Sequence, residues 1–468
     1  MFRRPALLLA AVLAIGQAQA ADPAERGLLV DLGGVPDAAR VEALKHSDGT
    51  DWWLEAGEVL LLVGNTARLR QSVPAQLVLR EVDNIRPDRL AVRPRGCIDH
   101  RQPLAGRDLL LVGDKWDLVN RPVSFAPAGL DAGQINPHLG LPEFVPVERN
   151  SVLARLHRFD RPEGLPPADP AVAHIAGKVD GRRWFETVSQ LASWDRSSYS
   201  NGLPQARAWI AARFAEAGLR TSEPVFEPPL TPPPPLPLAN VIGHARGYAA
   251  PDEWVIIGAH YDSRNQNLYS PENTPGADDN ASGCAGVIEA ARVLSRYRPR
   301  RTVLFICYAG EEQGLHGSTA HARALQESGD IGKVKAMLNM DMIGWVGDAT
   351  LGVNICTRPQ SAAGATELLD TLADAMATYA PELQVVTSSV VPSCCCSDHV
   401  PYLDRQRPAV HSIHRGGTAY PYYHTSNDTP ANLGPYAQAV GEGIVRGNVA
   451  ALVQLAGYDL LYAADFED

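Results

Sequence analysis

Two adjacent carboxylates, Glu311 and Glu312, follow an apolar run that extends from Val303 to Tyr308. A continuous apolar run of this length is typical of a buried strand, so the pair is expected at the strand's carboxyl end. Like charges at a buried position raise the free energy of the folded chain unless a cation compensates them. The pair therefore predicts a bound metal ion.

Six further histidine and aspartate residues are candidates for the same site. His260 and Asp262 follow the apolar run "WVIIGA", and Asp341 follows "VKAMLNM". Asp278 and Asp279 lie in the small-residue loop "PGADDNASG", and His424 lies in "YPYYHTSNDTP". The carboxyl ends of neighbouring parallel strands meet in one crevice, so these side chains are expected to converge there.

Imidazole and carboxylate ligands without thiolates favour zinc, with manganese or cobalt as possible substitutes. An open catalytic zinc site takes about three protein ligands, and two histidines with at least three carboxylates exceed that number. A pair of metal ions roughly 3.5–4 Å apart would use all of them. The residue types thus favour a two-metal centre.

The pattern of apolar runs predicts the elements that position these residues. From Ala239 onward, strands alternate with helices, which indicates an α/β fold with a mostly parallel sheet covered by helices on both faces. Pro204 is expected at the first position of an earlier helix, and Gly218 at its end. Helices are predicted over residues 205–217, 284–297, 316–326, 362–379 and 435–456.

A smaller β-rich domain is expected to precede this one. Residues 21–160 contain short alternating or apolar runs separated by turn residues. The stretch "RGCIDHRQP" inside it lacks a second ligand cluster and is interpreted as an ordinary loop. Residues 161–174, rich in proline and charge, are predicted to be a linker to a metal-bearing domain over 175–468. The N-terminal domain could cover the active site, bind a substrate or surface, or support dimerisation.

The first twenty residues are typical of a cleaved signal peptide. Arg3 and Arg4, which also fit a twin-arginine signal, precede an apolar run too short for the ~20 residues of a membrane span, and Ala18 and Ala20 form a small-x-small ending. We therefore expect a periplasmic or extracellular protein. The net charge of −11, without a run of basic residues, argues against nucleic acid as a partner.

Seven cysteines are present, and an exported compartment would let disulfides persist. Cys394, Cys395 and Cys396 are consecutive, and a disulfide is predicted in their loop. Cys284 and Cys307 are expected to be small buried apolar residues.

Five motifs resemble, in order, those of the secreted zinc aminopeptidases of peptidase family M28, which include bacterial leucyl aminopeptidases. They are "GAHYDS", "PGADDNASG", "YAGEEQGLHGS", "NMDMIG" and "YHTSNDTP", and the resemblance covers about residues 175–457. It implies a zinc exopeptidase-like fold, two zinc ions and hydrolysis of the N-terminal peptide bond of peptides with a free amino terminus, with apolar N-terminal residues favoured.

The resemblance also implies roles for the metal ligands. His260 and Asp341 would bind one zinc ion, Glu312 and His424 would bind the second or belong to its shared shell, and Asp279 would bridge the two. The peptide bond that joins Asp279 to Asn280 would be cis.

Four other residues receive supporting or structural roles. Glu311 would be the general base, and the alternation of side chains along a strand would point Glu311 toward substrate and Glu312 toward metal. Asp262 would hold the imidazole of His260, and Tyr423 would donate a hydrogen bond to the oxyanion. His399 in "SDHVPY" is expected to be structural.

Three other functions remain open from sequence. A glutaminyl cyclase has the same fold with a single zinc ion, and a carboxypeptidase of the family is a third enzyme. A metal-stabilised binding module without turnover belongs to another class. Glu311 argues against the last of these, because a structural metal site has no need of an additional carboxylate base.

Overall fold

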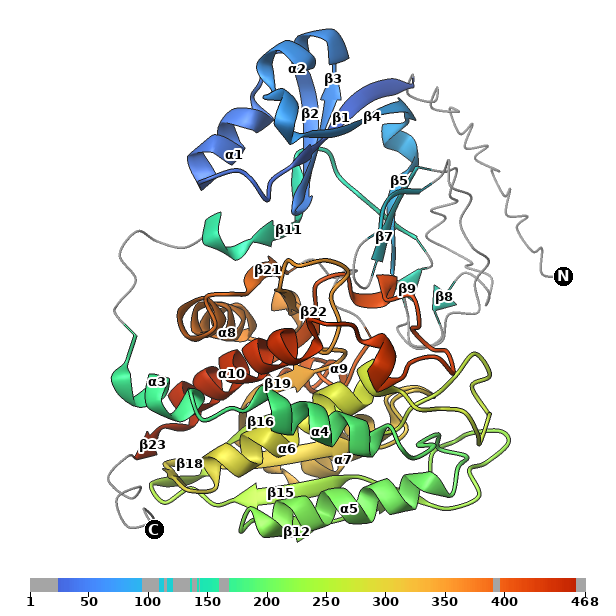
Figure 1. Ribbon diagram of the computed structural model, residues 1–468, viewed down its shortest axis with the longest axis vertical. Helices are drawn as coiled ribbons and strands as arrows, with labels where there is room; N and C mark the ends of the chain where they lie inside the picture. Colours follow the sequence, from blue (N-terminus) through green and yellow to red (C-terminus); the bar gives the residue numbers. More distant parts are fainter. Residues whose placement is uncertain are drawn as a thin grey trace, which may run out of the picture.

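A mixed sheet of thirteen strands runs through the protein in this computed structural model (Figure 1). The structure describes residues 24–94, 109–112, 116–120, 135–136, 141–142, 144–159, 168–389 and 396–459. In spatial order the strands are β12 (Arg220–Ser222), β15 (Val241–Ala245), β18 (Arg301–Tyr308), β16 (Ala250–His260), β19 (Val334–Met340), β22 (Ala409–His414), β20 (Gly352–Cys356), β21 (Gln384–Ser388), β11 (Ser151–Leu156), β2 (Thr50–Gly57), β3 (Val59–Gly64), β1 (Glu25–Asp31) and β4 (Val78–Ile85).

The central strands β18, β16, β19 and β22 run parallel to one another. Their register places His260, the last residue of β16, beside Tyr308, the last residue of β18. Met340, the last residue of β19, lies beside Ser412 of β22. The carboxyl ends of these strands are therefore level, which brings the residues that follow them to one edge of the sheet.

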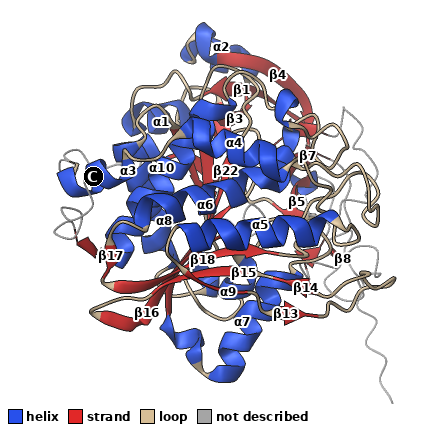
Figure 2. Ribbon diagram, turned by 60° about the horizontal axis from the view of Figure 1, so that its bottom comes forward, coloured by secondary structure: helices blue, strands red, loops and turns tan. Residues whose placement is uncertain are grey.

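Helices cover both faces of this part of the sheet. Val303 and Phe305 of β18 pack into one apolar core with α4, α5, α6, α8 and α10, whereas Leu304 and Ile306 pack into a second core with α7 and α9. Figure 2 shows α5 and α6 on one side of these strands and α7 on the other. The helices are α3 (Pro170–Ala176), α4 (Gly181–Leu191), α5 (Gly202–Glu216), α6 (Gly283–Leu294), α7 (His316–Ser328), α8 (Ala365–Tyr379), α9 (Val400–Leu403) and α10 (Ala437–Ala456).

The expected α/β fold is confirmed, with two differences in detail. Strands β12, β15 and β20 pair antiparallel with neighbours, so the sheet is mixed, and its longest parallel run is β18, β16, β19 and β22. Helix α5 begins at Gly202, so Pro204 is its third residue and not its first. Proline is tolerated there because N–H groups of the first helical turn have no partner within the helix. Gly218, with φ of +72°, ends the helix as expected.

The N-terminal residues form the predicted β-rich unit. Strands β1 to β4 pack on α1 (Ala38–Lys45) and α2 (Thr66–Ser72) through a core that includes Leu28, Leu60 and Leu69. A second sheet lies beside them and consists of β10 (Val145–Pro146), β5 (Leu90–Pro94), β7 (Trp116–Asn120) and β6 (Leu109–Val112).

Strand β11 joins this unit to the rest of the protein. It runs parallel to β2 and antiparallel to β21, where Arg155 faces Thr387 and Leu156 faces Val386. The two units therefore share one sheet, and β11 lies between them (Figure 1). The sequence contains no signal for this pairing. The domain boundaries at 160 and 175 stay a prediction, and α3 begins at Pro170, inside the predicted linker.

An ion pair also connects the two units. Arg415, which follows β22, binds both carboxylate oxygens of Glu58 at 2.6 and 2.8 Å, and also binds Asp348. Glu58 and Arg415 side chains are 23% and 27% exposed. Such a partly buried bidentate pair is stronger than an ordinary surface pair.

We expect Glu58→Gln to lower the free energy of unfolding by about 1–2 kcal/mol, because Arg415 keeps its burial but loses a charged partner. Urea unfolding followed by circular dichroism measures this change. Asp348→Asn removes the other, more exposed partner of Arg415 and should cost less than about 1 kcal/mol. If the two substitutions lower the free energy of unfolding equally, Glu58 contributes no more to stability than the exposed partner Asp348.

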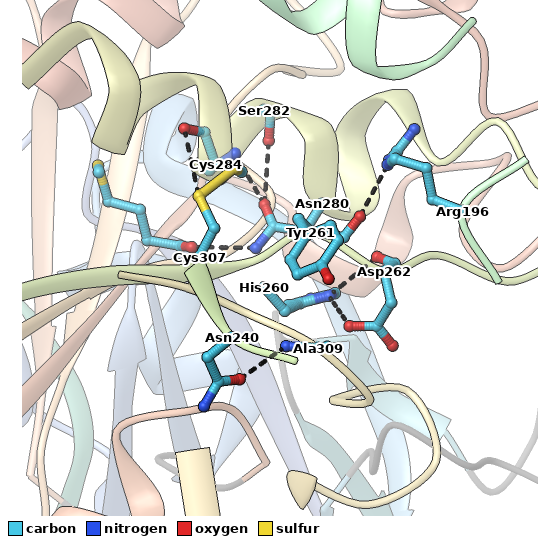
Figure 3. Close-up of a disulfide and its surroundings, with 12 residues drawn as sticks. Arg196, Asn240, His260, Tyr261, Asp262, Asn280, Ser282, Cys284, Cys307 and Ala309 are labelled. Carbon is cyan, nitrogen blue, oxygen red and sulfur yellow. Dashed lines mark hydrogen bonds and ion pairs between the residues drawn. A yellow bond between two sulfur atoms is a disulfide. The ribbon is translucent and has the colours of Figure 1, made fainter. Parts of the chain in front are cut away.

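Two cysteines are buried as expected, but they are also paired with each other, which the sequence analysis did not predict. Cys284, in the first turn of α6, and Cys307, in β18, form a disulfide with their Cα atoms 5.8 Å apart (Figure 3). Each looks like a buried apolar residue in its own segment, and only the packing of α6 on β18 brings them together. Cys356 and Cys396 each take part in a disulfide, which for Cys396 agrees with the disulfide predicted at the 394–396 loop.

Several sequence predictions concern residues outside the described ranges. These are the signal peptide, the "RGCIDHRQP" loop, most of the linker, and Cys394 and Cys395. Among the helices of the described ranges, none combines the length and the apolar character that crossing a membrane requires.

Candidate metal centre

The metal-binding candidates gather at the carboxyl edge of the central strands. His260 ends β16, and Asp341 directly follows β19. Glu311 and Glu312 lie in the turn that follows β18, and Asp279 lies in the segment that leads into α6. All five are buried, with side chains at most 6% exposed.

One half of the centre surrounds the ring of His260. Its Nε2 atom lies 3.3 Å from Oδ1 of Asp279, 3.5 Å from Oδ1 of Asp341 and 3.9 Å from Oε2 of Glu311. The ligand atoms of His260, Glu311 and Asp341 fall within 4.8 Å of one another, as do those of His260, Asp279 and Glu312. Groups this close can share a metal ion.

The other half surrounds His424. Its Nε2 atom lies 3.1 Å from Oδ2 of Asp279 and 3.2 Å from Oε2 of Glu312. Asp279 thus directs one carboxylate oxygen toward His260 and the other toward His424. This is the geometry of a carboxylate that bridges two ions.

Polar atoms at the centre fit a cation. Nε2 of His260 and both carboxylate oxygens of Glu312 are buried and make no hydrogen bond to any residue that the structure describes. Leaving such atoms without a partner costs free energy unless an ion contacts them. Imidazole and carboxylate donors are those that zinc prefers.

The pKa shifts show the same excess of negative charge. Burial raises the pKa of Glu311 well above its usual range, and the nearby carboxylates of Asp341 and Glu312 add to this, against the opposing effect of His260. Burial also raises the pKa of Glu312, with Asp279 contributing. These carboxylates disfavour ionisation because the protein alone does not balance their charge, and a bound cation would do so.

Asp262 orients both glutamates through their backbone. Its Oδ1 accepts a hydrogen bond from the N–H of Glu311 and its Oδ2 from the N–H of Glu312, each at 3.2 Å. The ring Nδ1 of His260 lies closer to the backbone carbonyl oxygen of Asp262, at 3.1 Å, than to its carboxylate, at 3.6 Å (Figure 3). The carboxylate therefore holds the Glu311–Glu312 turn more directly than it holds the imidazole.

Asp262→Asn is expected to weaken zinc binding by roughly 10–100-fold and to lower kcat for the peptide hydrolysis that the motifs imply by a similar factor. This is the range found for residues that support metal ligands. An asparagine side chain has one acceptor oxygen and cannot serve both N–H groups. Zinc affinity measured by competition with a chelator, together with kcat, would test this. Unchanged values for both quantities would show that the turn keeps its shape without the second acceptor.

The strand-alternation argument for Glu311 and Glu312 was wrong. Strand β18 ends at Tyr308, and Gly310 adopts φ of +70°, a left-handed conformation that turns the chain. Both glutamates then approach the same centre, Glu311 beside His260 and Glu312 beside His424. Their separation comes from a turn that Asp262 holds, because the strand has already ended.

Asp428 is a supporting residue that the sequence analysis missed. Its carboxylate accepts hydrogen bonds from the N–H groups of Asp278 and Asp279 at 2.9 and 3.0 Å, as Asp262 does for the two glutamates. The hydroxyl of Tyr420 also donates to it, at 3.1 Å. Asp428 stands four residues after His424 in a recognised motif, but residue type alone does not reveal its backbone partners.

The remaining candidates lie around this centre. The ring of Tyr423 stacks on His424 with centroids 3.7 Å apart. His399 stacks on His411, 5.1 Å away, and belongs to neither ligand group. The peptide bond that joins Asp279 to Asn280 is cis.

Comparison with known proteins gives a family match for the part of the chain that holds the centre. Residues 240–445, which contain every candidate ligand, match the model of peptidase family M28. The chain therefore contains a peptidase family M28 domain.

Curated relatives of this M28 domain are zinc metalloproteases by name. A probable zinc metalloprotease of Pyrenophora teres f. teres is 34% identical over 194 residues, which cover 38% of this chain and 40% of that protein. One from Leptosphaeria maculans is 36% identical over 169 residues, which cover 34% of this chain and 38% of that protein. The chain thus spans about two fifths of the length of the curated relatives it matches.

Solved structures share the fold of the M28 domain. The LapA aminopeptidase of Legionella pneumophila aligns with a TM-score of 0.51 and 22% identity over 64% of this chain and 77% of that chain. LapB of the same organism aligns with a TM-score of 0.51 and 18% identity over 92% of this chain and 100% of that chain. The shared fold therefore extends beyond the M28 domain.

Proposed function

We propose that this protein is an aminopeptidase that uses two zinc ions to hydrolyse the N-terminal peptide bond of peptides with a free amino terminus, favouring apolar N-terminal residues. The observation that carries the proposal is the position of Asp279 between His260 and His424, with Glu311 as an additional carboxylate beside them. Two solved structures of similar fold are described as aminopeptidases, one from Legionella pneumophila and one from Bacillus subtilis.

The ligand set divides into two halves. His260 and Asp341 would hold one zinc ion, Glu312 and His424 the other, and Asp279 both. Zinc, when bound, lowers the pKa of water and polarises a carbonyl group.

Glu311 is the proton carrier in this proposal. It takes a proton from the attacking water and delivers it to the amine that leaves. Burial raises the pKa of this carboxyl, and cations bound beside it would oppose that shift and favour the carboxylate form that a base requires. Tyr423, beside His424, would donate a hydrogen bond to the oxyanion that forms on the substrate.

Hydrolysis of leucine p-nitroanilide, compared with its N-acetylated form, tests the proposal. We expect cleavage of the free-amine substrate alone, loss of activity on chelation and recovery when zinc is added. Cleavage of both substrates would contradict an aminopeptidase. Absence of cleavage in zinc-loaded protein would also contradict it, and peptides with N-terminal glutamine would then test for cyclase activity.

We also propose that the protein is exported and loses residues 1–20. The basic, apolar and small-residue pattern of that segment supports export, and the Cys284–Cys307 disulfide suits an oxidising compartment. N-terminal sequencing of the protein from cell fractions tests this. A chain found in the cytoplasm with its first residues intact would contradict export.

A further inference from the structure

One arginine is completely buried beside the candidate metal centre. Arg196 lies between α4 and α5, and its exposed fraction is 0%. Within the described ranges no carboxylate lies at ion-pair distance from its guanidinium. All of its side-chain hydrogen bonds go to backbone carbonyl oxygens instead. A buried arginine of this kind is unusual, because buried charges are normally paired.

These hydrogen bonds connect two segments that carry metal ligands. Nε donates to the carbonyl of Tyr261 at 2.8 Å, and Tyr261 follows His260 (Figure 3). Nη1 donates to the carbonyl oxygen of Pro275 and Nη2 to that of Gly276, each at 2.7 Å. These two residues directly precede the segment that contains Asp279. One rigid, planar group therefore sets the distance between the His260 and Asp279 segments.

A fourth hydrogen bond anchors the guanidinium to the scaffold. Nη1 also donates to the carbonyl of Leu191 at 2.6 Å, and Leu191 is the last residue of α4. The guanidinium is thus fixed by a helix that packs into the main core. It cannot move with the loops without breaking this contact.

Neighbours of Arg196 bind the same segments. The N–H of Ser263 donates to the carbonyl of Arg196 at 3.2 Å, and the N–H of Thr274 donates to Asp195 at 2.7 Å. Ser198 donates to the side chain of Gln313, which follows Glu312, at 2.5 Å. Residues 195–198 therefore contact the segments that carry His260, Asp279 and Glu312.

Packing leaves little freedom for these segments to shift. Gly276 has φ of +49°, and a Cβ atom there would lie 2.4 Å from the Cβ of Ser263 and 2.3 Å from the carbonyl oxygen of Asp279. The segments before and after the loop 264–275 are thus in direct contact beside Arg196. An apolar side chain at position 196 would leave the carbonyls of Tyr261 and Pro275 without a donor among the described residues, whereas those of Leu191 and Gly276 also accept from backbone N–H groups.

The charge of Arg196 also suits this position. Burial lowers its pKa to about 10, against the opposing effect of Asp428 and Asp262, so it remains cationic at neutral pH. Asp428 and Asp262 are the two carboxylates that hold the backbone of Asp279 and of the glutamate pair. Arg196 is a fixed positive charge near both.

We propose that Arg196 is a positioning residue for the metal centre, which fixes the separation of His260 and Asp279 through the backbone carbonyls beside them and thereby sets zinc affinity. The inference rests on the proposed function only in requiring that this centre binds zinc. It does not depend on which peptide is cleaved.

The test measures zinc affinity in the absence of substrate. Arg196→Lys keeps the charge, but a single ammonium cannot reproduce the four hydrogen bonds. Arg196→Met removes the charge and the hydrogen bonds. We expect the zinc dissociation constant, measured by chelator competition on the apo protein, to rise by roughly 10–100-fold in Arg196→Lys. The visible spectrum of the cobalt-substituted variant should also change, because ligand geometry changes.

A matched control separates positioning from stability. Arg93 is another buried arginine, paired with Asp117 at 3.0 Å in the small N-terminal sheet. Arg93→Met should lower the thermal midpoint without changing zinc affinity or the cobalt spectrum. If Arg196→Met does not fold, Arg196→Lys decides the question.

Two results would overturn the inference. One is an Arg196→Lys variant with a lower thermal midpoint but wild-type zinc affinity and cobalt spectrum, which would indicate a purely structural residue. The other is a wild-type chain that binds no zinc. A wild-type chain that binds zinc but does not cleave leucine p-nitroanilide would refute the proposed activity and leave the inference on Arg196 testable.

Discussion

Glu311→Gln is expected to lower kcat for leucine p-nitroanilide by about 10²–10⁴-fold, the usual contribution of a general base, with little change in zinc content. Glutamine keeps the size of the side chain but cannot accept a proton near neutral pH. In the structure Glu311 reaches the centre at 3.9 Å from His260, and the other carboxylates already supply both halves of the ligand set. Steady-state kinetics and elemental analysis measure the two quantities.

The neighbouring residue provides the control for this prediction. Glu312→Gln makes the same chemical change one position along the same turn, but Glu312 faces His424 and is expected to bind metal. This variant should lose zinc as well as activity. If both variants lose zinc equally, Glu311 is a ligand and the general-base assignment is wrong.

Asp279→Ala is expected to reduce bound zinc from two ions to at most one and to lower kcat by more than the roughly 10–100-fold typical of residues that only support a ligand. Its carboxylate is the group that lies between His260 and His424. Without it, neither half of the centre keeps its full set of donors. Metal analysis after dialysis, and kinetics with added zinc, measure the change.

Asp341→Ala is the comparison for Asp279→Ala. Asp341 lies near His260 and belongs to the ligand group on that side. Loss of the Asp341 carboxylate should remove one zinc ion and leave the zinc ion on the His424 side in place. An Asp279→Ala variant that keeps more zinc than Asp341→Ala would contradict the bridging role of Asp279.

The site candidates were predictable because each depends on a short stretch of sequence. An apolar run followed by a carboxylate indicates a strand end, and parallel strands bring their ends together. His260, Glu311, Glu312 and Asp341 were found from such stretches, and the structure brings them to one edge. Asp279 and His424 were found from local motifs in the same way.

Supporting residues were harder to predict because they act on the backbone of distant segments. Asp428 holds the N–H of Asp279 across 149 positions of sequence, and Arg196 holds the carbonyl of Gly276 across 80. Every residue except proline offers the same backbone donor and acceptor, so the sequence does not reveal such a partner. Asp262 was chosen for its spacing from His260, yet its main contacts are with the glutamate turn.

By itself, the sequence determined the α/β fold, the family and the candidate ligands, because hydrophobic periodicity and local motifs act over a few residues. Only the tertiary structure decided the Cys284–Cys307 disulfide and the sheet shared by both units through β11 and β21. It also decided the turn at Gly310 that directs both glutamates to one centre. These features depend on how segments far apart in the chain pack against one another. Close packing is decided by the three-dimensional fit of side chains, which no short stretch of sequence specifies.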